Sequence, residues 1–235
     1  MLLKLARLFG FSLTGAAHSS GARATNRFPD PQVAALVAAA CRGDTAELRR
    51  LVAAGVDPNS KGDDGASPLS VAIACRDLGG VAALVAAGAD VDAVVESETL
   101  PLVMAIHQGG PGMFRLLVEH GADVYKYAPA TERNAVGEAF LYGFETGDWS
   151  NLDYLMDRGI DVDRFIDSRQ ADDLATFAAR MRRYDKSIAA VDRGYGRDVK
   201  KLVALAETDK GPQTQRVSRD RARLINRIRS TRMPD

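Results

Sequence analysis

The residues that could do chemistry in this sequence are few and widely separated. Its three histidines, His18, His107 and His120, show no His-x-x-x-His spacing, whereas a metal site needs clustered ligands. We expect the histidines to be surface residues. Cys41 and Cys75 form no Cys-x-x-Cys motif, so we expect half-buried or buried thiols. The sequence therefore predicts no metal and no cofactor.

The glycine-rich segments lack the residues that bind phosphate or dinucleotides. Gly194-Tyr195-Gly196 follows no predicted strand, and residues 109–112 (Gly-Gly-Pro-Gly) are not followed by Lys-Ser/Thr. The prominent carboxylates recur at repeat ends, which is typical of turn residues rather than of a catalytic pair. They are Asp57, Asp90, Asp123 and Asp161. No nucleophile–base arrangement is visible, so we expect neither an enzyme nor a small-molecule substrate.

The composition favours closely packed helices. Apolar residues make up 46% of the 235 residues but aromatic ones only 6%, so alanine and leucine must fill the core. No run approaches the roughly 20 apolar residues of a transmembrane helix.

The net charge of zero hides an uneven distribution. Residues 1–29 carry four bases and no acid, and residues 211–235 carry seven arginines and two aspartates. Residues 30–210 therefore carry a net charge of −9. This acidic body argues against a broad phosphate-binding surface, so no nucleic-acid partner is expected.

The spacing between Pro68 and Pro101 recurs elsewhere in the chain, between alanines and between glycines. The same spacing joins Ala39, Ala72 and Ala105, and it joins Gly55, Gly88 and Gly121. A fixed period in this range predicts stacked structural repeats.

Each unit is expected to contain two helices. Ser67 is a plausible cap for a first helix, and Pro68 suits its first turn. In the second helix, Leu84 and Val85 lie on the apolar stripe, and Gly88 ends it. The same offsets predict helix pairs at about 33–54, 68–87, 101–120 and 138–158, with Leu117 and Val118 buried like Leu84 and Val85.

These units resemble the ankyrin repeat, whose pattern is roughly D-x-x-G-x-T-P-L-H-x-A-A-x-x-G followed by V-x-x-L-L-x-x-G-A-D. Residues 65–69 (Gly-Ala-Ser-Pro-Leu) and 81–90 (Val-Ala-Ala-Leu-Val-Ala-Ala-Gly-Ala-Asp) match it closely. The glycine interval is longer between Gly121 and Gly159, so we expect a longer hairpin or loop between Tyr125 and Glu138. The Thr-Pro-Leu-His tetrad of the family pattern is never complete in this sequence. Each hydrogen bond lost in this way is expected to lower the stability by about 1 kcal/mol.

The resemblance implies an all-α ankyrin solenoid with a helical C-terminal cap. A weaker fifth unit places Ala190-Val191 before Gly194, as in the first helix of a repeat, and Leu202-Val203 in the second. The expected domains are a basic segment at 1–30, about four repeats at 31–163, a cap or degenerate repeat at 164–210 and a basic tail at 211–235.

The resemblance also implies a module that binds a partner protein through the concave face. In this family that face consists of hairpin tips and of two residues before the first glycine. The corresponding tip residues are Asp63, Asp64, Ala66, Glu96, Ser97 and Thr99. The helix positions are Arg42, Ala74, Cys75, His107, Gln108, Glu145 and Thr146. Acidic residues outnumber basic ones among them. This favours a partner with a basic surface. The alternative is that the acidic rim is only solvated and binds nothing.

The two basic ends leave several alternatives open. Residues 1–17 suit an unprocessed tail or membrane-surface helix, a secretory signal, or a transit peptide. In the tail, Val217, Leu224, Ile225 and Ile228 share one helical face. The tail is then either disordered, or a helix that binds a membrane surface, nucleic acid, a partner groove or the acidic face of its own chain. A membrane-associated adaptor is therefore the rival function.

The cysteines favour a reducing compartment, so we expect a cytoplasmic protein, or an exported one if residues 1–17 act as a signal peptide. We expect Cys41 and Cys75 to be unpaired, because adjacent helices lie roughly 8–10 Å apart and a disulfide spans less.

Overall fold

The computed structural model describes residues 27–95, 99–164, 174–180, 183–195, 199–209, 211 and 214–232. Two compact units divide after Glu138 and are described separately. Within the described residues there is no strand, only an isolated antiparallel bridge between Ala128 and Arg133. The expected all-α fold is confirmed. Our expectations for residues 1–26 lie outside the described ranges.

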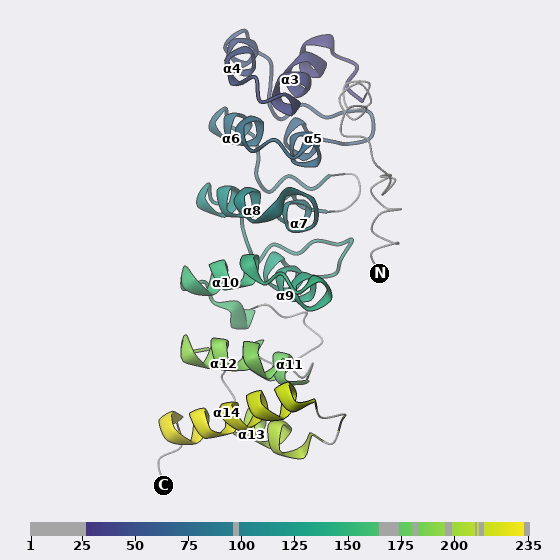
Figure 1. Cartoon of the computed structure of the whole chain (residues 1–235). Helices are drawn as coiled ribbons and strands as arrows, with labels where there is room; N and C mark the ends of the chain where they lie inside the picture. Colours follow the sequence, from purple (N-terminus) through teal and green to yellow (C-terminus); the bar gives the residue numbers. More distant parts are fainter. Residues whose placement is uncertain are drawn as a thin grey trace. The chain divides into compact units, whose positions relative to one another are not determined.

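The first unit stacks helix pairs in two layers. One layer contains α3 (Pro31–Cys41), α5 (Pro68–Cys75) and α7 (Pro101–Met104), which continues through the π-helical turn η1 (Ala105–Gly109). The other contains α4 (Thr45–Ala53), α6 (Leu78–Ala86) and α8 (Gly110–Glu119) (Figure 1). Each helix packs on its counterpart in the next pair. These bounds confirm the first three predicted helix pairs.

Serine residues replace part of the missing tetrad at the start of α5. The Ser67 hydroxyl accepts a hydrogen bond from the backbone N–H of Ser70 (3.1 Å), and the Ser70 hydroxyl accepts one from the N–H of Ser67 (3.0 Å). This reciprocal capping box satisfies two helix-terminal donors. Ser70, which occupies the histidine position of the tetrad, therefore stabilises its own helix.

The periodic aspartates are turn residues, as expected. Asp57, Asp90 and Asp123 each accept a hydrogen bond from the backbone N–H two residues later, at 2.8–2.9 Å. Such Asx turns fix the path of the chain after each second helix.

Two further side chains tie neighbouring hairpins together. Asn59 donates from Nδ2 to the carbonyl oxygen of Gly88 (2.9 Å) and accepts from the N–H of Asp90 (2.7 Å). Asp92, which occupies the position of Asn59 in the next repeat, accepts from the N–H of Asp123 (3.0 Å). These bonds join the hairpins of successive repeats.

The apolar stripe of the second helices is only partly as predicted. Leu84 and Leu117 are fully buried, which confirms their place in the core. Val85 and Val118 are only half-buried, because they lie one position further round the helix, at the edge of the packed stripe.

Gly80 of α6 lies close to the backbone of α3. A Cβ atom at this position of α6 would overlap the carbonyl group of Ala40 in α3. A Gly80→Ala substitution should therefore destabilise the fold by about 1–3 kcal/mol, because side-chain rotation cannot relieve overlap with backbone. Gly79→Ala is the control, since its Cβ would meet only the Asp77 side chain, at 3.3 Å. Urea denaturation of both variants tests this, and equal midpoints would contradict it.

The prediction of two free thiols is wrong. Cys41 and Cys75 form a disulfide, with their Cα atoms 5.3 Å apart. The prediction used the distance between helix axes, but each Cα lies about 2.3 Å from its axis. Facing Cα atoms of helices roughly 8–10 Å apart therefore approach to within the range of a disulfide. The bond joins the last residues of α3 and α5, in adjacent repeats.

The extra residues before the fourth pair form the expected longer hairpin. The N–H of Ala128 donates to the carbonyl oxygen of Arg133 (2.8 Å), and the intervening residues make the turn. The N–H of Ala135 donates to the carbonyl oxygen of Val124, which closes the base of the hairpin.

The second unit is also built from helices. They are α9, which begins at the end of the first unit (Ala135–Thr146), α10 (Ser150–Asp157), the 3₁₀ turn η2 (Val162–Arg164), α11 (Leu174–Arg180), α12 (Tyr184–Asp192), α13 (Val199–Thr208) and α14 (Gln215–Arg232). α9 and α10 confirm the fourth predicted pair. α11 packs on α12 and α13, and α14 packs on α12 and α13.

Gly194 ends the second helix of a pair, whereas the sequence placed it after a first helix. The N–H groups of Gly194 and Tyr195 donate to the carbonyl oxygens of Val191 and Ala190. The same pattern surrounds Gly55, Gly88 and Gly121, and Gly194 has their left-handed backbone (φ 90°). α13 packs on α11 and α14 packs on α12, so α11 and α12 form one pair and α13 and α14 the next. The triplet Asp-Arg-Gly at 157–159, which recurs at 192–194, could have shown this register.

The basic tail is a packed helix rather than a disordered segment. Leu224 and Ile228 on α14 are fully buried, and Val217 and Ile225 are half-buried. Arg227 pairs with Asp192 of α12 at 2.7 Å. The predicted apolar stripe thus exists, but it packs on α12 and α13 of its own unit. None of the described helices is long and apolar enough to cross a membrane.

Candidate binding surface

Several of the predicted face residues in the first unit reach solvent. Arg42, at the end of α3, and Asp63, in the first hairpin, are exposed. Asp64, Ala74 and Gln108 are partly exposed. In the second unit, Glu145 and Thr146 are exposed at the end of α9.

Three other predicted positions have different roles. Ala66 and Thr99 are buried, so their side chains pack inside the hairpins instead of facing a partner. Cys75 is committed to the disulfide with Cys41. Glu96 and Ser97 lie outside the described residues.

The acidic character of the first hairpin is reduced by Arg27. Its guanidinium pairs with the Asp64 carboxylate at 3.1 Å, and its carbonyl oxygen accepts from the N–H of Asp63 (2.8 Å). Asp63 thus remains the exposed acid of this tip, next to the exposed Lys61.

His107 is not the surface histidine that we expected. Its Nε2 lies 2.7 Å from Oε1 of Glu138, and the two side chains are only 13% and 2% exposed. Arg133 lies 3.9 Å from the other carboxylate oxygen. Histidine and glutamate are 31 residues apart, so no local pattern in the sequence indicates this buried pair. His107 therefore stabilises the packing of its repeat, while His120 is exposed as expected.

Two exposed apolar side chains on the hairpins were missed. Val94 is 45% exposed and Tyr127 is 55% exposed, among the largest apolar side chains that reach solvent in the described residues. They stand one repeat period apart, at the same position of successive hairpins, where the first hairpin has Lys61. The repeat offset could have revealed them, because it aligns both residues with Lys61. A charged residue at this position indicates that it faces solvent, so an apolar residue there is expected to be exposed.

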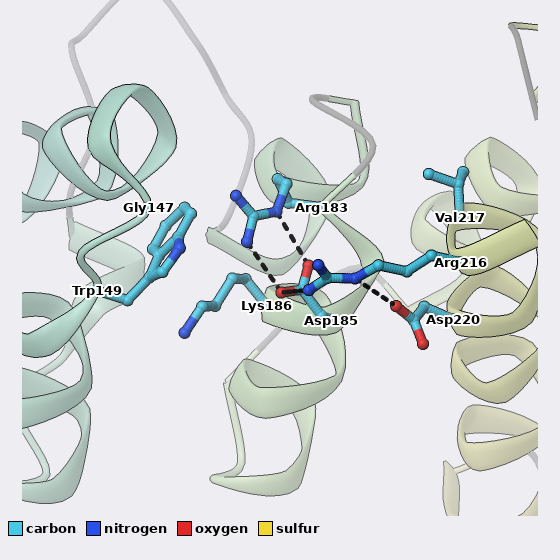
Figure 2. A pocket seen from close by; sticks show the side chains of 8 residues that line it. All are labelled: Gly147, Trp149, Arg183, Asp185, Lys186, Arg216, Val217 and Asp220. Atoms are coloured by element: carbon cyan, nitrogen blue, oxygen red, sulfur yellow. Dashed lines mark hydrogen bonds and ion pairs between the residues drawn. The ribbon is translucent and has the colours of Figure 1, made fainter. Parts of the chain in front are cut away.

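The second unit contains a pocket of about 510 Å³ between the starts of α10, α12 and α14 (Figure 2). The indole of Trp149 forms one wall, with the Arg183 guanidinium 4.4 Å and the Lys186 ammonium 4.8 Å from the ring centroid. Both cations lie within the range of cation–π attraction. The sequence indicated none of these residues, because they come from three separate helices.

The electrostatics of this pocket favour negative charge. Burial raises the pKa of Asp185, but hydrogen bonds from Arg183 and the charges of Arg183, Arg216 and Lys186 lower it more. The net pKa is below its usual value, so the carboxylate stays ionised.

No group of three His, Cys, Asp or Glu side chains among the described residues is arranged to hold a metal ion.

Comparisons with known proteins agree with the stacked helix pairs. Residues 36–128 match the family described as "Ankyrin repeats (3 copies)". The crystal structure of the human ASB11 ankyrin repeat domain is similar, with a TM-score of 0.52 and 20% identity, covering 82% of each chain. No curated protein matches the sequence. Residues 36–128 therefore consist of ankyrin repeats. Ankyrin repeats are generally protein–protein interaction modules, on a fold that is typically a non-enzymatic scaffold.

Proposed function

We propose that this chain binds a partner protein through its hairpin face, defined here as Asp63, Asp64, Val94 and Tyr127 with the helix ends at Arg42, Ala74 and Gln108. The observation that carries this proposal is the pair of exposed apolar side chains, Val94 and Tyr127, on successive hairpins. Burying them against a partner removes apolar surface from water.

The chemistry of the hairpin face also suggests the character of the partner. Tyrosine is enriched among the residues that dominate binding energy at protein interfaces. Asp63 adds an exposed negative charge at the neighbouring tip. A partner with an apolar centre and a basic rim would complement this arrangement.

Photo-crosslinking tests the location of this surface. A photoreactive residue at position 127 should capture one defined protein in native lysate, whereas the same residue at the exposed position 49 on α4 should not. Capture from both positions, or from neither, would contradict the proposal.

Substitutions then test the energetics with the captured partner. Tyr127→Ala should weaken binding about 30-fold or more, which is the effect of an interface hot spot of about 2 kcal/mol. Tyr127→Phe retains the ring and should bind nearly as well as the original chain. Calorimetric titration measures both, and an unchanged affinity for Tyr127→Ala would remove the hairpin face as the centre of binding.

We also propose that the protein works in a compartment that permits disulfides, as an exported protein rather than a cytoplasmic one. The Cys41–Cys75 disulfide supports this, because reducing compartments keep cysteine thiols reduced. The mass of the mature N-terminus provides the test, since export by a signal peptide requires cleavage. An intact N-terminus on cytoplasmic protein with two free thiols would contradict the proposal.

A further inference from the structure

The pocket in the second unit gathers more positive than negative charge around one buried carboxylate. The Asp220 side chain is 10% exposed, and guanidinium nitrogens of Arg216, Arg219 and Arg223 lie 3.6–3.9 Å from its oxygens. These three arginine side chains are 66–70% exposed. One carboxylate thus pairs with three arginines of α14, of which Arg216 also lines the pocket.

Arg216 is the cation best placed to accept a ligand. It reaches from α14 to Asp185 of α12 (3.6 Å) and also lies 3.7 Å from Asp220 on its own helix, as Figure 2 shows. Both distances exceed a good hydrogen bond, and within the described residues its guanidinium donates no hydrogen bond. By contrast, Arg183 donates two short hydrogen bonds to Asp185, at 2.9 and 3.0 Å. The donors of Arg216 thus remain available to an incoming oxyanion.

Trp149 fixes the other side of the pocket. The charged groups of Arg183 and Lys186 lie beside its ring, and both residues line the pocket (Figure 2). Lys186 also pairs with Asp153 at 3.2 Å, so its ammonium group is held in place. Arg183 and Lys186 are thus bonded to carboxylates of the protein, whereas the planar guanidinium of Arg216 can donate to an added carboxylate or phosphoryl group.

We propose that this pocket binds an acidic peptide segment, seating one carboxylate or phosphoryl group on the guanidinium of Arg216. Its volume of about 510 Å³ lies within the range of small-ligand sites and admits an acidic side chain. This interaction is independent of the hairpin face, which lies in the first unit.

The burial of the apolar stripe on α14 argues against a membrane as the occupant. A helix that lies on a lipid surface inserts an exposed apolar face, but Leu224 and Ile228 are fully buried in the protein. Nucleic acid fits less well, because it neutralises many phosphates along an extended cationic surface. Here Asp185 and Asp220 separate the cations, so the pocket offers a single anion position.

Fluorescence provides a direct measurement, since Trp149 is the only tryptophan of the chain. Titrating the full-length protein with a blocked tetraglutamate peptide, and with its phosphoserine counterpart, should change Trp149 emission saturably. Comparison of the two peptides identifies which oxyanion the pocket prefers. Inorganic phosphate tests whether the anion alone suffices.

Two variants of α14 make the test specific. Arg216→Gln should weaken peptide binding about tenfold, because it removes charge-assisted hydrogen bonds to the ligand. Arg229→Gln removes one charge from the same helix, where Arg229 pairs with Glu207 at 2.6 Å, and should leave binding unchanged. Circular dichroism of both variants verifies that the fold is retained.

Three results would overturn the proposal. The first is an absence of any saturable emission change or heat with either peptide. The second is an equal loss of affinity in the two variants, which would mean non-specific attraction to a basic helix. The third is tighter binding to phosphatidylserine vesicles or single-stranded DNA that neither peptide displaces.

Discussion

Leu84→Ala is expected to lower the free energy of unfolding by about 2–5 kcal/mol. Leu84 is fully buried in α6, between neighbouring repeats, and truncation to alanine removes apolar contacts and leaves a cavity. Leu117→Ala should behave in the same way, because Leu117 occupies the equivalent position of the next repeat. Denaturant unfolding followed by circular dichroism measures the loss.

The same helix provides a matched control. Leu78, at the start of α6, is 47% exposed, so Leu78→Ala removes the same atoms from a position that is already partly hydrated. We expect a loss well below that of Leu84→Ala. If Leu78→Ala proved as damaging as Leu84→Ala, the assignment of the buried face of α6 would be wrong.

Loss of the Cys41–Cys75 disulfide is expected to lower the free energy of unfolding by about 3–4 kcal/mol. The two cysteines are 34 residues apart, and a cross-link over such a loop restricts the unfolded chain by about this much in the chain-entropy treatment. The double substitution of both cysteines by alanine should show the full effect in chemical denaturation.

Reductant supplies the control for this prediction. Dithiothreitol should destabilise the original chain but leave the double-alanine variant unchanged. Thiol titration of the protein isolated without reductant, in denaturant, should detect no free thiol. Detection of two thiols would contradict the disulfide and, with it, the proposal of an oxidising compartment.

The helix pairs follow from local sequence signals. Pro68 and Pro101 sit at helix starts, Gly55, Gly88 and Gly121 follow helix ends, and the structure places α3 to α8 within a few residues of the predicted bounds. These signals act over one or two turns of chain, where capping, backbone conformation and apolar spacing alone decide the outcome. The constant repeat period then determines that the pairs stack, because no single pair can bury its apolar face.

Contacts between distant residues depended on the tertiary structure. The disulfide, the His107–Glu138 pair and the Trp149 pocket each join side chains from different helices, 31 or more residues apart. The exposure of Tyr127 and the burial of Thr99 likewise depend on which side of a hairpin meets the core.

The basic tail shows the same division. The sequence by itself determined that residues 214–232 can form a helix with one apolar face, because the spacing of Leu224 and Ile228 is a local property. The tertiary structure decided that this face packs on α12 and α13 and that Arg216 reaches the pocket. The spacing of charges along a helix does not say which side of the helix faces the protein. Packing decides this, and it places Arg216 at the pocket while Arg229 pairs with Glu207 at the surface.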